Sequence, residues 1–203
     1  MQGNGPVTVV RWLDGFGRAE RMVCRVEVPG SGGTGFLIGP DLVLTSLHVV
    51  QGLLRGDDPH CARLVFGERR SGFHEQWLAG SDECRDFAVV RSAEEVGNDC
   101  CGDGVRGWLE IPDVAPELKK GLFLFIAQHP AASVLMSPAA VDAVDESAVH
   151  YRANTFNGSS GSPCFDVHLR LVAMHRAMSG GVPIARIRDA LRLSLPRSPT
   201  ALH

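Results

Sequence analysis

Turn-forming glycine, proline and aspartate residues recur along this chain at intervals of roughly ten residues. The 203 residues include 23 glycines and 12 prolines. Glycine costs a helix about 1 kcal/mol relative to alanine, and proline removes a helical hydrogen bond. The segments left between such turns suit short β-strands, so the sequence favours an all-β fold over a helical bundle.

The composition limits the class of protein. The formal net charge is −3 and 21% of the residues are charged, so no basic excess points to nucleic acid or to an acidic membrane surface. A hydrophobic content of 44% is sufficient for a packed core and is untypical of a disordered chain. The longest strongly apolar stretch, residues 121–127, is far too short to cross a bilayer. We therefore expect a globular protein that binds neither nucleic acid nor membrane.

Short apolar segments between the turns predict the strands. Residues 21–28 alternate polar and apolar side chains, which is the pattern of a half-buried strand. Residues 35–39 and 41–45 flank a Gly-Pro-Asp turn and predict a hairpin. Further strands are expected at residues 62–66, 86–90, 122–126 and 169–174.

Two helices are expected beside these strands. A short one is expected at residues 48–54. The other is expected near residues 183–195, because a proline suits its first turn and Ile184, Ile187 and Leu191 follow at helical spacing.

One segment is a candidate linker. Residues 94–107 are rich in Gly, Asp and Asn and divide the chain into halves of similar size. The sequence therefore predicts one domain over residues 1–203, built from two β-barrels or sandwiches at about 7–100 and 105–182 and closed by the C-terminal helix.

The six cysteines favour a reducing compartment. They follow no regular spacing and are too sparse for a disulfide scaffold, and residues 1–6 lack the features of a secretory signal. No Cys-x-x-Cys pair supports a zinc site, so we expect no metal and no cofactor. We expect reduced thiols in a cytoplasmic protein. The cysteines are Cys24, Cys61, Cys84, Cys100, Cys101 and Cys164.

Three segments carry His, Asp and Ser in that order. His48 follows the second strand of the predicted hairpin, Asp86 heads an apolar run, and Ser160 lies in a Gly-rich turn. A serine hydroxyl is a poor nucleophile until a neighbouring imidazole accepts its proton, and a carboxylate on the other ring nitrogen fixes the imidazole tautomer. The sequence thus indicates nucleophilic catalysis by these three residues.

The turn around the serine also supplies candidate oxyanion donors. The oxyanion of a tetrahedral intermediate needs fixed backbone N–H groups. Glycines in the segment Gly158-Ser-Ser-Gly161 let successive amides point the same way. We therefore expect the amides of Gly158 and Ser160 to form the oxyanion hole.

Several residues admit a second interpretation. Asp82, Asp99 and Asp103 are rivals of Asp86, but only Asp86 heads a β-rich run. His129 precedes a proline in a turn, which favours a structural role over a catalytic one.

Unrelated families of hydrolases carry their catalytic triad in different orders along the chain, and the order His, Asp, Ser is that of the chymotrypsin class. With Thr45-Ser-Leu-His48, Asp86-Phe-Ala-Val and Gly158-Ser-Ser-Gly-Ser-Pro163, the sequence resembles the trypsin-like (chymotrypsin-fold) serine peptidases over roughly residues 21–193. This resemblance implies two six-stranded antiparallel β-barrels, a C-terminal helix and an active site in the groove between the barrels.

Two departures from the secreted members of that family are informative. Val49 follows His48, where the secreted relatives carry a disulfide-forming cysteine. Ser159 precedes the candidate nucleophile, where they carry an aspartate that pairs with a newly cleaved N-terminus. Activation by cleavage of the familiar kind is therefore not expected.

The motifs are most similar to those of glutamyl endopeptidases and of intracellular bacterial trypsin-like domains found beside defence effectors. In glutamyl endopeptidases, the residues at the positions of Thr155 and His175 contact a glutamate at P1, the substrate residue before the scissile bond. The resemblance therefore implies an S1 pocket containing Thr155 and His175 and a preference for acidic P1 residues. The matching segments are Gly33–Leu37, Gln128–Pro130, Tyr151–Thr155, Gly158–Pro163, Val172–His175 and Gly181–Ile184.

The expected function is that of a serine endopeptidase in a bacterial defence or signalling system, acting on a protein or peptide substrate and regulated by a protein partner. One alternative is a catalytically silent trypsin-fold binding module. Another is a Deg-type quality-control protease, but such proteases usually carry a signal peptide and a PDZ domain, for which the segment after Pro196 is too short.

Overall fold

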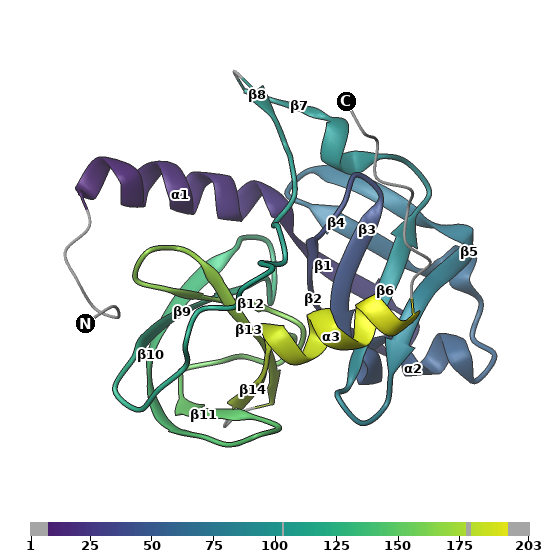
Figure 1. The fold of residues 1–203 in the computed structure, drawn as a ribbon. Helices are drawn as coiled ribbons and strands as arrows, with labels where there is room; N and C mark the ends of the chain where they lie inside the picture. Colours follow the sequence, from purple (N-terminus) through teal and green to yellow (C-terminus); the bar gives the residue numbers. More distant parts are fainter. Residues whose placement is uncertain (1–7, 103, 178–179, 195–203) are drawn as a thin grey trace, which may run out of the picture.

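The computed structural model describes residues 8–102, 104–177 and 180–194 (Figure 1). Two closed six-stranded antiparallel barrels lie side by side, and three α-helices accompany them. The predicted all-β, chymotrypsin-like architecture with a C-terminal helix is confirmed.

The first barrel has the strand order β1-β2-β3-β6-β5-β4. The helix α2 (Leu47–Leu54) and the 3₁₀ turn η1 (Pro59–Cys61) follow β3 and connect it to β4. The strands are β1 (Val23–Val28), β2 (Ser31–Leu37), β3 (Leu42–Ser46), β4 (Arg63–Phe66), β5 (Arg69–Asp82) and β6 (Phe87–Ser92).

The second barrel has the strand order β10-β11-β14-β13-β12-β9. The helix α3 (Ile184–Ser194) follows directly on its last strand. The strands are β9 (Phe123–Gln128), β10 (Leu135–Val144), β11 (Val149–Arg152), β12 (Pro163–Asp166), β13 (Leu171–Ala177) and β14 (Gly180–Pro183).

Between the barrels runs a connection that includes the predicted linker. It contains η2 (Val96–Asn98) and the short paired strands β7 (Cys100–Cys101) and β8 (Gly104–Val105). The guanidinium of Arg106 in this connection is buried, donates to the carbonyl of Arg21 over 2.8 Å and lies 5.1 Å from the centre of the Phe66 ring. The connection is therefore packed against the first barrel.

Three apolar clusters hold the molecule together. One fills the first barrel and another fills the second. The third lies between them, where Phe36 and Phe87 of the first barrel meet Met174 of the second and Ile187 of α3. Burying a large apolar side chain stabilises a fold by about 2 kcal/mol, so α3 and the facing strands fix the position of one barrel against the other (Figure 1).

The helix α1 (Val9–Met22) is absent from the sequence-based expectations. It lies across the second barrel (Figure 1), where the Trp12 indole donates to the Val167 carbonyl over 2.8 Å and its ring lies 5.2 Å from that of Phe125. Gly15 and Gly17 weaken the sequence signal for this helix, because glycine lowers intrinsic helix propensity. A Cβ at Gly15 would lie 2.1 Å from Leu169 Cδ1, so tertiary contact explains this glycine.

Three predicted strand starts are wrong. The strand predicted from residue 35 begins at Ser31. Residues 21–28 do not form one strand, because Arg21 and Met22 end α1 and β1 begins at Val23. The strand predicted from Leu169 begins instead at Leu171. Leu169 has a φ of 60° and its N–H donates to the Asp166 carbonyl, so it belongs to the preceding turn.

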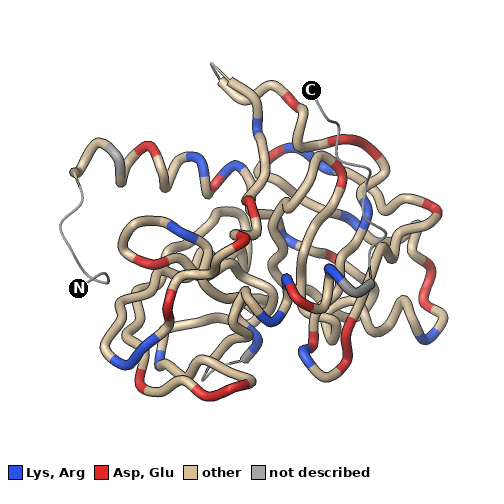
Figure 2. Tube along the Cα trace, in the orientation of Figure 1, with Lys and Arg blue, Asp and Glu red and all other residues tan. Residues whose placement is uncertain are grey.

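Charged residues are distributed over both barrels. Figure 2 shows acidic and basic residues interspersed along the strands, the loops and the helices. Within the described ranges, no helix is long and apolar enough to span a membrane.

Candidate active site

Strand pairing in the first barrel brings His48 and Asp86 together. Strands β3 and β6 are antiparallel neighbours, with Ser46 opposite Phe87. His48 lies two residues beyond Ser46, and Asp86 lies one residue before Phe87. The two side chains therefore emerge at the same end of the strand pair.

The contacts between these two residues are specific. His48 Nδ1 lies 2.7 Å from Asp86 Oδ2, and the His48 backbone N–H donates to Asp86 Oδ1 over 3.0 Å. The Asp86 carbonyl also accepts from the N–H of Leu47. Asp86 has a φ of 53°, a left-handed conformation that aspartate tolerates better than most residues. A carboxylate at Nδ1 leaves Nε2 of His48 as the ring atom able to accept a proton.

The rival aspartates lie in other environments. Asp82 pairs with Arg85 over 2.5 Å, and the Asp99 carboxylate accepts from Arg69 Nε over 3.0 Å. Asp103 lies outside the described residues. Among the described rivals, none contacts His48, so the choice of Asp86 agrees with the geometry.

Ser160 lies in a turn that is hydrogen-bonded to strand β2 of the first barrel. The Thr34 N–H of β2 donates to the Ser160 carbonyl over 2.8 Å, and the Thr34 hydroxyl donates to the Gly158 carbonyl over 2.7 Å. Gly158 and Gly161 have φ values of 96° and 91°, which only glycine adopts readily. The Gly161 N–H donates to the His175 carbonyl over 2.8 Å, which joins the turn to β13.

Both expected oxyanion donors are free. In the described part of the chain, the amides of Gly158 and Ser160 have no hydrogen-bond acceptor. The Ser160 hydroxyl donates to the carbonyl of Arg176 over 3.2 Å, and no hydrogen bond joins it to His48 among the described residues. Catalytic hydrogen bonds are often loose without substrate, so the missing bond to His48 does not argue against Ser160 as the candidate nucleophile.

One cavity of about 530 Å³ is lined by the expected site residues. Its lining comes from both barrels, as expected for a groove between them. The lining residues are His48, Glu83, Asp86, Thr155, Phe156, Asn157, Gly158, Ser159, Ser160, His175 and Arg176.

A second cavity, of about 580 Å³, lies elsewhere, against α1. It is lined by Arg18, Trp108 and His168 among others, and it contains none of the three candidate catalytic residues. Size alone would favour this cavity, but the paired imidazole and carboxylate and the adjacent serine identify the smaller one as the candidate active site.

Comparison with known families agrees with this choice. The sequence profile of the family described as trypsin-like peptidase domain matches residues 33–174, which is more than half of the chain. The chain belongs to the trypsin-like peptidase family.

Individual relatives of this trypsin-like peptidase domain are distant. The uncharacterized protein y4fB of Sinorhizobium fredii (strain NBRC 101917 / NGR234) is 28% identical over 209 residues, which cover 89% of this chain and 31% of the relative. This chain therefore spans about a third of the length of that relative.

Solved structures share the fold at low sequence identity. Deg5 superposes with a TM-score of 0.70 and 16% identity, covering 89% of this chain and 91% of Deg5. The inactive form of the Rv3671c protease superposes with a TM-score of 0.68 and 17% identity, covering 96% of this chain and 99% of that chain. A serine-to-alanine mutant of Rv3671c from M. tuberculosis H37Rv gives a TM-score of 0.68 and 16% identity, covering 98% and 100% of the two chains.

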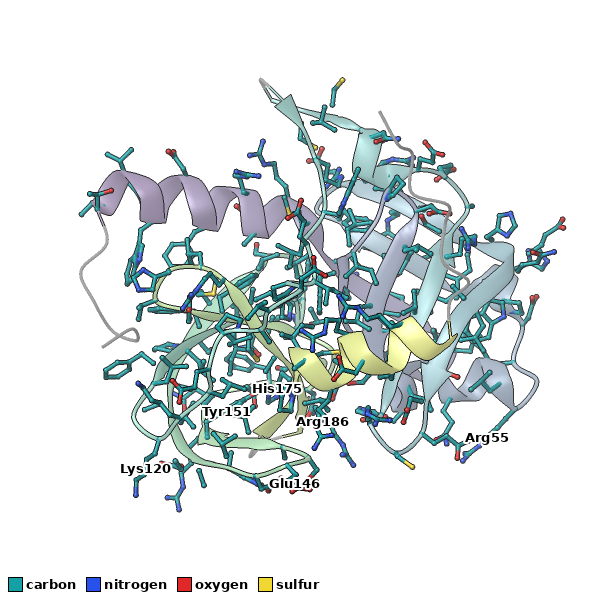
Figure 3. The ribbon with its side chains drawn as sticks, in the orientation of Figure 1. Arg55, Lys120, Glu146, Tyr151, His175 and Arg186 are labelled. Carbon is teal, nitrogen blue, oxygen red and sulfur yellow. The ribbon has the colours of Figure 1, made fainter. Side chains whose placement is uncertain are left out.

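The two residues expected in the S1 pocket of the trypsin-like peptidase domain line the same cavity as Ser160. His175 is buried, and its Nδ1 lies 2.8 Å from the Tyr151 hydroxyl (Figure 3). Burial raises the pKa of Tyr151 well above its usual value, so its hydroxyl keeps the proton. This hydroxyl also lies 3.4 Å from Cys164 Sγ, and it donates to Nδ1 only in the His175 tautomer that carries its ring proton on Nε2. In that tautomer, the Nε2–H of His175 and the Thr155 hydroxyl are both hydrogen-bond donors.

Sequence patterns missed three residues that shape this site. The guanidinium of Arg176 lies with its Nε 3.5 Å from Asp86 Oδ2, across the barrel boundary. Tyr151 and Gln128 were matched only as parts of motifs, and neither motif indicates the partner of its side chain. The near-complete burial of polar side chains such as Gln128 becomes visible only in the fold.

Acid is expected to destabilise the peptidase domain through His175. Burial lowers the pKa of His175 to about 4 from its usual 6.5, so between these values the unfolded chain binds the proton more readily than the folded one. Stability therefore falls as the pH drops through this interval, by about 3 kcal/mol between pH 7 and pH 4. Burial lowers the pKa of His129 as well, which adds a contribution of the same sign.

Urea denaturation at pH 7 and pH 4 measures this effect. The variant His175→Gln is expected to lose less stability on acidification than the wild type. His74→Gln provides the control, because it makes the same change at a histidine that is exposed on β5. Equal acid sensitivity of wild type and His175→Gln would show that this imidazole is not the responsible group.

Proposed function

We propose that this chain is a serine endopeptidase that uses Ser160 as its nucleophile, His48 as its base and Asp86 to orient His48. The observation that supports this proposal most strongly is the 2.7 Å pairing of His48 Nδ1 with Asp86 Oδ2 in the cavity that also contains Ser160. The backbone amides of Gly158 and Ser160, which have no acceptor among the described residues, support it as well. Family membership supports the same reaction class.

The proposed reaction proceeds through an acyl-enzyme. The Ser160 hydroxyl leaves the Arg176 carbonyl and transfers its proton to Nε2 of His48 while Oγ attacks the scissile carbonyl carbon. The Gly158 and Ser160 amides donate to the resulting oxyanion, and the protonated His48 then gives its proton to the leaving amine. A water molecule, deprotonated by His48, releases the acyl group from Ser160 and restores the enzyme.

The S1 pocket is proposed to prefer acidic P1 side chains. A neutral imidazole N–H from His175 and a hydroxyl from Thr155 are both hydrogen-bond donors that can satisfy a carboxylate. Tyr151 is proposed to support this role by donating to Nδ1, which leaves the His175 proton on Nε2. The lowered pKa of His175 keeps this donor neutral at neutral pH.

The biological setting is also a proposal. We place the endopeptidase in the cytoplasm, as part of a bacterial defence or signalling system with a protein substrate and a regulatory partner. The six cysteines are unpaired, which suits a reducing compartment, and a relative occurs in a bacterium as part of a longer protein. Comparing new protein N-termini in host cells that express wild type or Ser160→Ala tests this setting. A single cleaved substrate supports it, and indiscriminate cleavage contradicts it.

Cleavage of a peptide library by wild type and by Ser160→Ala tests the reaction. We expect cleavage by wild type only, enriched for Glu or Asp at P1, and loss of that enrichment in His175→Ala. Equal cleavage by wild type and Ser160→Ala would refute the mechanism. Unchanged P1 selectivity in His175→Ala would refute only the acidic pocket.

A fluorophosphonate probe separates the peptidase from a silent binding module. This probe phosphonylates an activated serine with loss of fluoride. We expect one adduct on Ser160 in the wild type and none in Ser160→Ala. A folded wild type that neither reacts with the probe nor cleaves the library would support the binding module instead.

A further inference from the structure

A buried glutamine lies behind the turn that carries the nucleophile. Gln128 is the last residue of β9 and its side chain is completely inaccessible to solvent. Each polar group of a buried primary amide destabilises the fold when it is left without a hydrogen-bond partner. The partners of Gln128 therefore indicate what the fold uses it for.

The Gln128 carbonyl oxygen contacts the nucleophile turn at two points. Oε1 accepts from the Phe156 backbone N–H over 3.2 Å and lies within hydrogen-bond distance of the Ser159 hydroxyl, whose one proton also faces the Phe156 carbonyl oxygen at 2.6 Å. The Ser159 hydroxyl oxygen accepts from the same Phe156 N–H over 2.9 Å. These bonds enclose Gly158, whose amide is one of the two expected oxyanion donors.

The amide nitrogen of Gln128 fixes the orientation of the whole group. Nε2 donates to the Ser137 hydroxyl over 2.6 Å and to the Asn154 carbonyl over 3.1 Å. The Ser137 hydroxyl donates to the same carbonyl over 2.8 Å. Both ends of the side-chain amide therefore have suitable partners, and a flipped amide would face two donors with its NH₂ group.

The turn itself depends on these anchors. The Ser159 N–H donates to the Phe156 carbonyl over 3.0 Å, and Gly158 is the third residue of this turn with a φ of 96°. A type II turn requires such a left-handed third residue. The Gly158 carbonyl is held by Thr34 on one side, and Gln128 holds Phe156 and Ser159 on the other.

We propose that Gln128 is a positioning residue that keeps the Gly158 amide directed at the reacting carbonyl oxygen. This inference rests on the proposed peptidase function and assigns it a further residue. Because the anchor consists of neutral hydrogen bonds within the folded chain, the oxyanion turn is assembled on folding and requires neither a new N-terminus nor an ion pair. Gln128 does not touch the substrate and acts through Phe156 and Ser159.

The variant Gln128→Leu tests the proposal. Leucine keeps much of the side-chain volume and removes both the carbonyl oxygen and the NH₂ group of the amide. Displacement of an oxyanion donor affects the transition state more than substrate binding. We expect kcat to fall about 100-fold with KM changed less than about threefold. Affinity for a peptide aldehyde, whose hemiacetal oxygen needs the same donors, is expected to fall in parallel.

A second, smaller change on the same turn keeps the proposal testable if Gln128→Leu fails to fold. Ser159→Ala removes one contact of Gln128 with the turn and little volume, and we expect kcat to fall about tenfold. Since both changes act on one turn, the double variant is expected to be little worse than Gln128→Leu alone. Independent, additive effects of the two changes would contradict the proposed shared role.

Ser71→Ala provides the matched control. Ser71 is a buried serine of the first barrel whose hydroxyl donates to Glu94, and it does not line the cavity of the candidate site. We expect this variant to lower the melting temperature while leaving kcat unchanged. If Gln128→Leu likewise lowers only the melting temperature, Gln128 is merely structural and the proposal is wrong.

Hydrogen exchange separates this inference from the proposed function. Gln128→Leu is expected to accelerate amide exchange in residues 154–159, and Ser71→Ala is not. If the wild type proves inactive but exchange accelerates in this way, the function fails and the positioning role stands. If the wild type is active and neither exchange nor kcat responds to Gln128→Leu, only the positioning role fails.

Discussion

His48→Ala is expected to lower kcat/KM for peptide cleavage by about 10⁴- to 10⁶-fold. His48 is the only described imidazole paired with Asp86 beside Ser160, so its removal leaves no group to accept the serine proton. Asp86→Asn is expected to cost about 10⁴-fold, because an asparagine amide can donate to Nδ1 and thereby move the ring proton to Nε2.

Steady-state kinetics on a peptide identified from the library measure these losses. His150→Ala is a suitable control, because His150 is exposed on β11 and bonds to Asp145 in a surface loop. This control should retain the wild-type kcat/KM. Activity of His48→Ala within tenfold of the wild type would exclude His48 as the base.

Gly161→Ala is expected to destabilise the protein by at least about 3 kcal/mol. Two costs combine at this position. The φ of 91° is unfavourable for any residue with a Cβ, and an added Cβ would lie 2.1 Å from the Thr34 carbonyl oxygen and 2.9 Å from the Ser46 nitrogen. Both of these atoms belong to the backbone of the first barrel. Moving them would disturb the hydrogen bonds between Thr34 and the turn that contains Ser160.

Gly30→Ala isolates the conformational cost. Gly30 has a φ of 70°, and a Cβ there would have no neighbour within 4 Å. We expect this variant to lose only about 1 kcal/mol and to keep full activity. Urea denaturation gives both free energies of unfolding, and equal losses at the two glycines would show that contact with Thr34 adds no cost.

Local patterns in the sequence predicted an all-β fold of two halves, whereas the two six-stranded barrels were implied by the resemblance to trypsin-like peptidases. Short apolar runs beside a turn predicted the β2–β3 hairpin, and helical spacing of apolar residues predicted the C-terminal helix. No local pattern predicted β5, β10, β11 or β14. The helix α1 could not be predicted this way, since Gly15 and Gly17 weaken its local signal and its stability comes from contacts with the second barrel.

The candidate catalytic residues could be selected from motif and order, and the structure brings them together. Their supporting residues could not be selected. Arg176 contacts Asp86 across the two barrels, and Gln128 contacts Ser159 from a strand about thirty residues earlier in the chain. Such pairs are determined by tertiary packing and leave no spacing pattern in the sequence.

Thr34 is hydrogen-bonded to both barrels. This one buried threonine donates to the Ser160 and Gly158 carbonyls and accepts from the His129 N–H, all on the second barrel, while its own carbonyl accepts from Thr45 three residues before His48. The turn of Ser160 and the strand that leads to His48 are thus held together by short hydrogen bonds beside the candidate site. We therefore expect the covalent connection between the barrels to tolerate changes in length that leave these bonds in place.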